Sequence, residues 1–333
     1  MKDCPNKTIE ILSEGYLITQ KLKILHMKRR SFFKNGLIAG AAAITGLSVP
    51  KSLMAFGGSR KANSFNMKFS PEFGIFSEVA GKGLDDQIKW GHDHGFTAWE
   101  NTYLKNRPVE EHELISNTIQ KLGMEFGQFV GTMNFKEVTF AGRDAAVRDN
   151  VLNEVRASVE IAKRMNTKYI HNVLGVADPK LPWDFQSANA IELLKRIAEI
   201  YEPHGLIMVM ETMNHKINHP GMFLHTVPQA YALAKAVGSP SVKLLFDVYH
   251  VQIQEGNLIP TLDYAWDEIA YFQIGDTPGR FEPSTGEINY VNLLKHIYDK
   301  GYRGFLGLEH GKSQPGKQGE LAVLEAYKKI DFR

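Results

Sequence analysis

The chain has 333 residues, of which 43% are hydrophobic and 23% are charged, a composition that permits a sizeable core and argues against wholesale disorder. The formal net charge at pH 7 is only +2, which argues against a nucleic-acid coat protein or a polybasic membrane binder. The chain contains one cysteine, Cys4, so a disulfide framework and a cysteine-rich zinc or iron–sulfur site are excluded.

The first 55 residues differ in charge from the rest of the chain. They carry nine Lys or Arg and three acidic residues, a net of +6, which leaves −4 for residues 56–333. The run Lys28-Arg29-Arg30-Ser31-Phe32-Phe33-Lys34 resembles the twin-arginine export signal of bacteria. A weakly apolar run over residues 36–49 follows it, and Ala55 then offers a small residue at a cleavage point.

This segment predicts a cleaved signal, export by the twin-arginine machinery and a periplasmic protein. The alternatives are a membrane anchor or a buried helix. The apolar run is shorter than the ~20 residues that a membrane span needs, so no stable membrane anchor is expected. Met27 directly precedes the basic run, and translation from Met1 or from Met27 therefore stays open. The predicted organisation is a signal-bearing extension over residues 1–55 and a single catalytic domain over residues 56–333.

From residue 67 onward, short apolar runs alternate with longer amphipathic ones. The apolar runs predict eight strands, at residues 68–76, 96–100, 125–131, 169–174, 206–212, 242–248, 271–274 and 304–308. Helices are predicted over residues 83–94 and 109–122. Two more are indicated by apolar faces, the first formed by Val147, Val151, Val155, Val159 and Ala162 and the second by Ala190, Leu193, Leu194, Ile197 and Tyr201.

This alternation predicts an α/β protein, specifically a (β/α)8 TIM barrel in one domain. The later strands are short and apolar without strict alternation, as expected when both faces are buried. A doubly wound open sheet is the alternative. It would usually have fewer strands and often a glycine-rich phosphate loop after the first, and the sequence contains neither G-x-G-x-x-G nor a Walker loop.

Polar residues close the last four predicted strands, where the active site of such a barrel lies. They are Glu211, Asp247, Gln273 and Glu309. One acid at a strand end is more typical of a helix cap or a surface charge, but four at successive strand ends predict a metal site. Three carboxylates and an amide oxygen favour one Mn²⁺ or Mg²⁺ ion and tolerate Co²⁺ or Zn²⁺.

Four stretches also carry a family resemblance. They are Glu211-Thr-Met-Asn214, Phe246-Asp-Val-Tyr-His250-Val-Gln252, Gln273-Ile-Gly-Asp-Thr-Pro-Gly-Arg280 and Gly286-Glu-Ile-Asn-Tyr290. Together they resemble the hydroxypyruvate isomerase family of xylose isomerase-like TIM barrels, over about residues 67–325.

The resemblance implies one divalent metal held by Glu211, Asp247, Gln273 and Glu309. It further implies that Glu211 and Glu309 move protons and that His250 and Arg280 contact the substrate. The segment after Glu211, which includes Lys216 and His219, departs from the family, because the isomerases have a shorter pattern at this place.

Such a site suits isomerisation or epimerisation of a small sugar or keto acid. The reaction begins with loss of a proton α to a carbonyl, and a divalent ion stabilises the enediolate charge that develops. One carboxylate removes the proton and a second returns it. Arg280 can bind a substrate carboxylate through two parallel hydrogen bonds. His171 and Glu100, at the ends of the fourth and second predicted strands, are weaker candidates for contacts with substrate hydroxyls.

Three other functions use related features. A metal-dependent lyase or dehydratase of the same fold has the same ligands. An exported, non-catalytic carbohydrate-binding barrel would be expected to lack one of the two glutamates, and both are present. Cleavage of phosphodiesters, as in endonuclease IV, needs three metals and a basic face, which the acidic body does not offer. We therefore expect a small-molecule substrate and no nucleic acid, with a homo-oligomer left open.

Overall fold

The computed structural model describes residues 64–332. The predicted export signal and the predicted domain boundary at residue 55 lie outside this range and stay predictions. Within residues 64–332, no helix combines the length and the apolar character that crossing a membrane requires.

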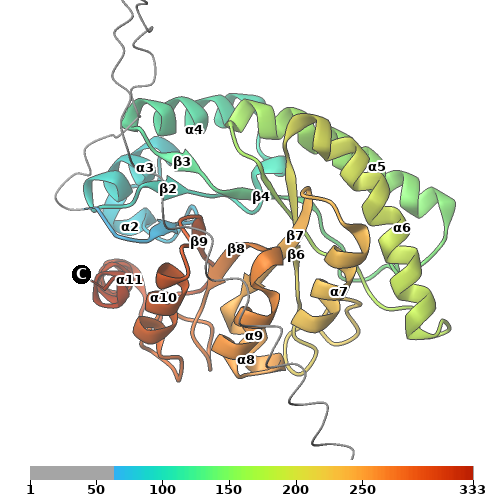
Figure 1. The fold of residues 1–333 in the computed structure, drawn as a ribbon. Helices are drawn as coiled ribbons and strands as arrows, with labels where there is room; N and C mark the ends of the chain where they lie inside the picture. Colours follow the sequence, from blue (N-terminus) through green and yellow to red (C-terminus); the bar gives the residue numbers. More distant parts are fainter. Residues whose placement is uncertain (1–63, 333) are drawn as a thin grey trace, which may run out of the picture. The chain divides into compact units, whose positions relative to one another are not determined.

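The described chain alternates strands and helices, as predicted (Figure 1). The strands are β1 (Lys68–Ser70), β2 (Ala98–Trp99), β3 (Glu125–Phe126), β4 (Gln128–Thr132), β5 (Tyr169–Asn172), β6 (Ile207–Glu211), β7 (Val242–Asp247), β8 (Ile269–Ile274) and β9 (Phe305–Leu308). The α-helices are α2 (Ser77–Ala80), α3 (Leu84–Asp93), α4 (Val109–Leu122), α5 (Ala145–Met165), α6 (Trp183–Tyr201), α7 (Val227–Val237), α8 (Val248–Gln254), α9 (Leu258–Ala265), α10 (Tyr290–Asp299) and α11 (Gly316–Ile330). Short 3₁₀ helices are η1 (Leu104–Asn106), η2 (Glu202–His204) and η3 (Trp266–Glu268).

The strands form a closed parallel barrel. Seven of them pair in the order β1-β9-β8-β7-β6-β5-β4, and β2 pairs with β3. Only Gly127 separates β3 from β4, so these two continue as one barrel strand. The backbone N–H of Glu100 donates to Pro71 O at 3.0 Å and links the end of β2 to the end of β1. The predicted (β/α)8 barrel is therefore confirmed, and the open doubly wound sheet is wrong.

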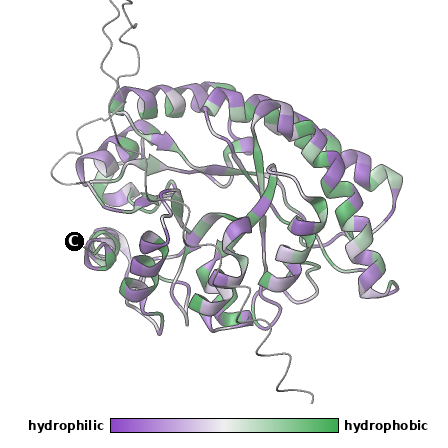
Figure 2. Cartoon of the chain, viewed as in Figure 1, coloured by the Kyte–Doolittle hydropathy of each residue, from purple (hydrophilic) through white to green (hydrophobic). Residues whose placement is uncertain are grey.

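The helices bury the apolar faces that the sequence predicts. Helix α5 begins at Asp144, whose side chain accepts a hydrogen bond from Val147 N, and ends at Asn166 in the left-handed conformation. Its buried residues include Val151, Val155, Val159 and Ala162. Figure 2 shows the resulting alternation of hydrophilic and hydrophobic stretches along this helix. This amphipathic packing holds the barrel strands, and hence the site at their ends, in place.

Two predicted strands differ from the structure. The run over residues 68–76 contributes only Lys68–Ser70, because Pro71 follows without a backbone N–H to continue the ladder. Ile75 and Phe76 are nevertheless buried in the core just before α2. The run over residues 125–131 is divided at Gly127. The four helices predicted by residue correspond to α3, α4, α5 and α6, and no residue range was predicted for the other helices.

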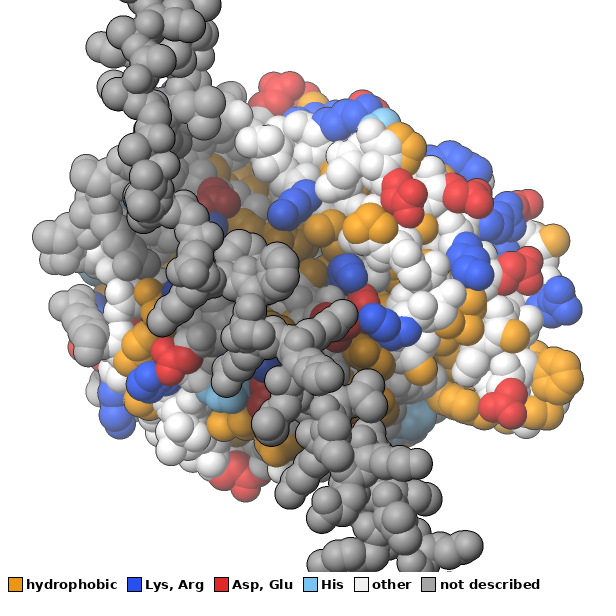
Figure 3. Space-filling view, viewed as in Figure 1, with side chains coloured by type: hydrophobic (Ala, Val, Ile, Leu, Met, Phe, Trp, Pro, Cys, Tyr) orange, Lys and Arg blue, Asp and Glu red, His pale blue; other side chains and the backbone are white. Residues whose placement is uncertain are grey.

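The outer surface over α5 and α6 carries charges of both signs. Figure 3 shows basic and acidic side chains interspersed there. Exposed pairs on these helices include Arg196 with Asp149 at 3.7 Å and Lys163 with Glu160 at 2.8 Å. Mixed, solvated pairs of this kind contribute little to stability individually. They give this part of the surface no field of a single sign that would attract a polyanion.

Candidate metal and substrate site

Four neighbouring strands bring the predicted ligands to one end of the barrel. Glu211 and Asp247 end β6 and β7, Gln273 lies one residue before the end of β8, and Glu309 follows β9. Asp247 and Gln273 face each other in the register of β7 and β8. Glu211, Asp247 and Gln273 are fully buried, whereas Glu309 is partly exposed. All four thus meet at the carboxyl ends of the strands, where a TIM barrel places its active site.

Several polar atoms at this end are buried without a hydrogen-bond partner in residues 64–332. They are Glu211 Oε1, Gln273 Oε1 and Nε2, Glu309 Oε2 and His250 Nε2. An unsatisfied buried polar atom costs about 1–3 kcal/mol, so a folded protein rarely leaves several together without a reason. Oxygens from three of the four predicted ligands are among these atoms. The donor set present therefore fits a divalent cation.

The charges of these carboxylates also favour a bound cation. Burial raises the pKa of Glu211 well above its ordinary value, and the negative charges of Glu309 and Asp247 raise it further. Burial also raises the pKa of Asp247 and of Glu309, although the Arg280 guanidinium partly opposes this. One arginine cannot balance these three carboxylates, and a divalent cation would complete the neutralisation.

His250 and His171 lie against these carboxylates. His171 Nε2 is 2.7 Å from Glu211 Oε2. His250 Nε2 is 3.5 Å from Glu211 Oε1 and 3.7 Å from Asp247 Oδ2. One candidate ligand atom from each of Glu211, Asp247 and His250 lies within 4.8 Å of the others, an arrangement that can hold a metal ion.

The tautomer of His250 decides between a ligand and a donor. The Asn214 Oδ1 accepts hydrogen bonds from the backbone N–H groups of Ile217 and Asn218, so its Nδ2 is the atom 2.5 Å from His250 Nδ1. An amide nitrogen only donates, so Nδ1 accepts and the proton lies on Nε2. Burial lowers the pKa of His250 well below its ordinary value, which keeps the ring neutral. Nε2–H is then a donor, and the predicted contact of His250 with the substrate stays a prediction.

Arg280 reaches into the same site from the loop after β8. One terminal nitrogen lies 3.2 Å from Asp247 Oδ2 and 2.9 Å from Glu309 Oε1, and Nε donates to the Glu309 backbone O at 3.2 Å. Burial disfavours its charged form, but the carboxylates of Glu309 and Asp247 outweigh that effect and raise its pKa. Arg280 therefore stays a cation.

The Arg280 loop is held by Asp276, a residue that the sequence analysis did not single out. Its two carboxylate oxygens accept hydrogen bonds from the backbone N–H groups of Thr277, Ser284, Gly286 and Ile288, at 2.9–3.1 Å. A second carboxylate, Glu282, accepts from Ser313 N in the loop after β9. These contacts fix the backbone around Arg280, whose φ is 54°.

Glu100, which was predicted to contact substrate hydroxyls, lies deeper inside the barrel than that prediction requires. It is fully buried, accepts from Tyr271 Oη and from Gln128 Nε2, and its carboxylate occupies the space where a Cβ at Gly307 would lie. Burial raises its pKa well above its ordinary value, and the negative charge of Glu72 adds to this effect. The structure therefore places Glu100 within the barrel interior and not in the group around Glu211 and Asp247.

Glu72, two residues beyond β1, was missed. It accepts hydrogen bonds from the backbone N–H of Thr102 and from Asn101 Nδ2 at 3.1 Å, and its charge acts on Glu309 and Glu100. The signal was present in the sequence, because an acid follows the first predicted strand just as acids follow the last ones. Because the first strand was predicted to run through residue 76, Glu72 fell inside the predicted strand and not at its end.

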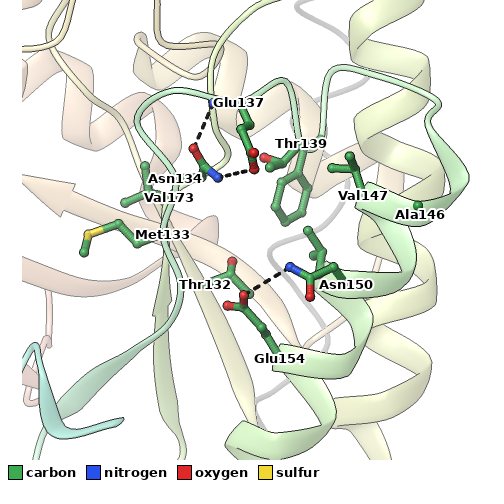
Figure 4. A pocket seen from close by; sticks show the side chains of 12 residues that line it. Thr132, Met133, Asn134, Glu137, Thr139, Ala146, Val147, Asn150, Glu154 and Val173 are labelled. Carbon is green, nitrogen blue, oxygen red and sulfur yellow. Dashed lines mark hydrogen bonds between the residues drawn. The ribbon is translucent and has the colours of Figure 1, made fainter. Parts of the chain in front are cut away.

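A cavity of about 300 Å³ lies between the loop after β4 and the first turns of α5. Figure 4 shows it between Thr132, Glu137 and Glu154, with Asn134 bonded to Glu137 and Asn150 to Glu154. None of the eight predicted site residues lines it. The cavity is therefore not the metal site.

Comparison with known proteins agrees with this geometry. The sequence profile described as "Xylose isomerase-like TIM barrel" matches residues 88–330. Hydroxypyruvate isomerase of Escherichia coli (strain K12) is 34% identical over 191 residues, which cover 56% of this chain and 70% of the relative. A putative hydroxypyruvate isomerase of Homo sapiens is 33% identical over 266 residues, covering 76% of this chain and 92% of the relative.

Solved structures show the same fold. The AP endonuclease, family 2, of Brucella melitensis has a TM-score of 0.66 at 22% identity, covering 78% of this chain and 99% of that one. The IolI protein, solved with a binding zinc atom, has a TM-score of 0.64 at 20% identity, covering 79% and 98%. The relatives indicate an enzyme of the isomerase class, which confirms the predicted class. With its profile match, its relatives and its closed barrel in agreement, the chain belongs to the xylose isomerase-like TIM barrel family.

Proposed function

We propose that this protein is a divalent-metal-dependent isomerase or epimerase of a small sugar or keto acid, similar to hydroxypyruvate isomerase. The observation that carries the proposal is the convergence of unpartnered, buried oxygens of Glu211, Gln273 and Glu309 at the carboxyl ends of the strands. The names of the curated relatives, hydroxypyruvate isomerase and 2-oxo-tetronate isomerase, support it.

Glu211, Asp247, Gln273 and Glu309 would hold the metal. When bound, a divalent ion supplies positive charge that stabilises negative charge on the substrate's oxygens. Oxygen ligands favour Mn²⁺ or Mg²⁺, and the zinc atom in the related IolI structure makes Zn²⁺ an alternative.

Glu211 and Glu309 would transfer the proton. A positioned carboxylate can take a proton from carbon α to a carbonyl, and a carboxylic acid can return it. Glu211 and Glu309 come from β6 and from the end of β9, with two strands between them, and can therefore approach a bound substrate from different sides. One removes the proton to give an enediolate, and the other returns it to the neighbouring carbon or the opposite face.

Two further side chains would hold the substrate. The Nε2–H of His250 donates to a substrate hydroxyl or carbonyl oxygen. One terminal nitrogen of Arg280 pairs with both Asp247 and Glu309, and the other terminal nitrogen can bind a carboxylate. A lyase of the same fold would use the same ligands. The isomerase names of the relatives favour isomerisation over elimination.

The proposal is tested by turnover. The metal-free protein, obtained with a chelator, is expected to be inactive, and Mn²⁺ or Mg²⁺ is expected to restore interconversion of hydroxypyruvate, a 2-oxo-tetronate or a ketose. Proton exchange from deuterated water into the substrate, followed by NMR, reports the α-proton step directly. A metal-loaded, folded protein that exchanges no α-proton in any of these compounds would contradict the proposal.

We also propose that residues 27–55 direct the protein to the periplasm. The basic run around Arg29 and Arg30 supports this, with the apolar run behind it. A reporter fused to residues 27–60 is expected to reach the periplasm, and Lys at both positions is expected to abolish that transport. Arg60→Lys, the same exchange in the same fusion but beyond the signal, serves as the control. Unchanged transport of the double-Lys fusion would exclude the twin-arginine route.

A further inference from the structure

Three loops at the carboxyl end of the barrel are joined into one wall. They follow β4 (residues 133–144), β5 (residues 173–182) and β6 (residues 212–226). Val176 N donates to Glu137 O at 3.0 Å, Ala177 N to Gly221 O at 2.8 Å, and Phe223 N to Gly175 O at 2.9 Å. Gly175, at φ 78°, has no room for a Cβ against the loop after β4.

This wall holds a row of three rings that ends at the metal site. Phe135, from the loop after β4, stacks on His219, from the loop after β6, with ring centroids 5.1 Å apart and planes 19° from parallel. The His219 ring is in turn 5.3 Å from that of His250. His250 faces Glu211 and Asp247, so His219 stands one ring farther from the carboxylates.

The two outer rings are available to a ligand. Phe135 is 41% exposed and His219 is half-buried. Within residues 64–332, the ring nitrogens of His219 make no hydrogen bond, although its backbone N–H donates to Asn214 O at 3.0 Å. The loop therefore fixes the position of an imidazole whose donor and acceptor are both unused.

A neutral imidazole beside an exposed aromatic face suits a hydroxylated carbon chain. Imidazole can donate to one hydroxyl and accept from another, and the aromatic ring packs against C–H groups. We infer that His219, with Phe135 behind it, binds a hydroxyl group of the substrate beyond the carbons that exchange the proton. The substrate class is thus a polyhydroxylated acid or ketose longer than three carbons. This inference rests on the proposed function for the position of the reacting carbons.

The test compares two acids that differ by one hydroxylated carbon. Glycerate has three carbons and erythronate has four. Binding of each to the Mn²⁺-loaded protein is measured by calorimetry, which requires no turnover. The wild-type protein is expected to bind erythronate more tightly than glycerate. His219→Phe keeps a ring against Phe135 but removes both nitrogens, and it is expected to weaken erythronate binding by ~3–10-fold, the range for one uncharged hydrogen bond, with glycerate binding unchanged.

The matched control is Lys216→Ala, an exposed change in the same loop, which is expected to leave both affinities unchanged. His219→Gln, which keeps a donor and an acceptor, is expected to restore part of the preference. Equal affinity of the wild type for both acids, including no measurable binding of either, would overturn the inference. So would equal weakening of both acids by His219→Phe, because that is the result of a purely structural role. A preference that depends on His219 in a protein without turnover would uphold the inference and reject the proposed reaction.

Discussion

Replacing either Glu211 or Glu309 by Gln is expected to lower turnover by ~10²–10⁴-fold, the usual contribution of a positioned acid or base. Gln retains an oxygen that can contact a metal but cannot accept a proton from carbon. Metal affinity should therefore fall much less than turnover, because three other ligands remain. Steady-state kinetics and metal titration of the same samples measure the two effects separately.

The two variants are also expected to differ from each other. If each glutamate serves one carbon or one face, one variant still exchanges the α-proton with deuterated water while forming no product. Glu113→Gln, an exposed change on α4, is the matched control and is expected to leave turnover unchanged. Near-normal turnover in both Glu211→Gln and Glu309→Gln would show that the two-glutamate mechanism is wrong.

Metal binding is expected to stabilise the folded chain by about 2.7 kcal/mol when Mn²⁺ is present at one hundred times its dissociation constant. The reason is that the ion binds the assembled carboxylates and not the unfolded chain. Thermal unfolding with and without the ion measures the change. Glu113→Gln should show the full stabilisation, whereas Asp247→Asn should show less. A folded protein whose melting temperature does not respond to Mn²⁺, Mg²⁺, Co²⁺ or Zn²⁺ would contradict the site.

This stabilisation is expected to grow with pH. In the metal-free folded chain, burial raises the pKa of Glu211, Asp247 and Glu309, so each binds a proton more tightly when folded than when unfolded. Between the unfolded and the raised folded pKa values, the stability of the metal-free chain therefore falls as pH rises. A metal needs the ionised carboxylates, so its effect increases over the same range. The difference in melting temperature should therefore widen as the pH rises above the ordinary carboxylate range toward the raised pKa values of the folded chain.

The strand-end pattern was sufficient to predict which carboxylates gather at one end of the barrel, and it failed for a side chain that turns into the barrel interior. Glu211, Asp247 and Glu309 follow apolar runs that end where expected, so a parallel barrel brings them together. Glu100 follows such a run too, but the missing side chain at Gly307 lets it turn into the interior. No sequence pattern near Glu100 shows that a glycine on a distant strand leaves space for its side chain.

The loops were beyond prediction for a different reason. Asp276 and Asn214 act on backbone N–H groups, and neither residue type nor spacing says which groups a loop will present. The row from Phe135 through His219 to His250 joins three parts of the chain that have no common periodicity. Their meeting depends on backbone hydrogen bonds between loops, which the sequence does not encode as a motif.

Those bonds have a consequence for how such an enzyme can diversify. The wall formed by the loops after β4, β5 and β6 is joined through main-chain groups, which every residue except proline possesses in full. The side chains of Phe135 and His219, which make none of these bonds, are therefore free to change without breaking them. Exchanges at positions 135 and 219 would alter the shape and polarity that the proposed substrate meets, while the proposed metal ligands at the strand ends stay where they are. In such a barrel, substitutions in the loops can change the substrate range without moving the residues at the strand ends.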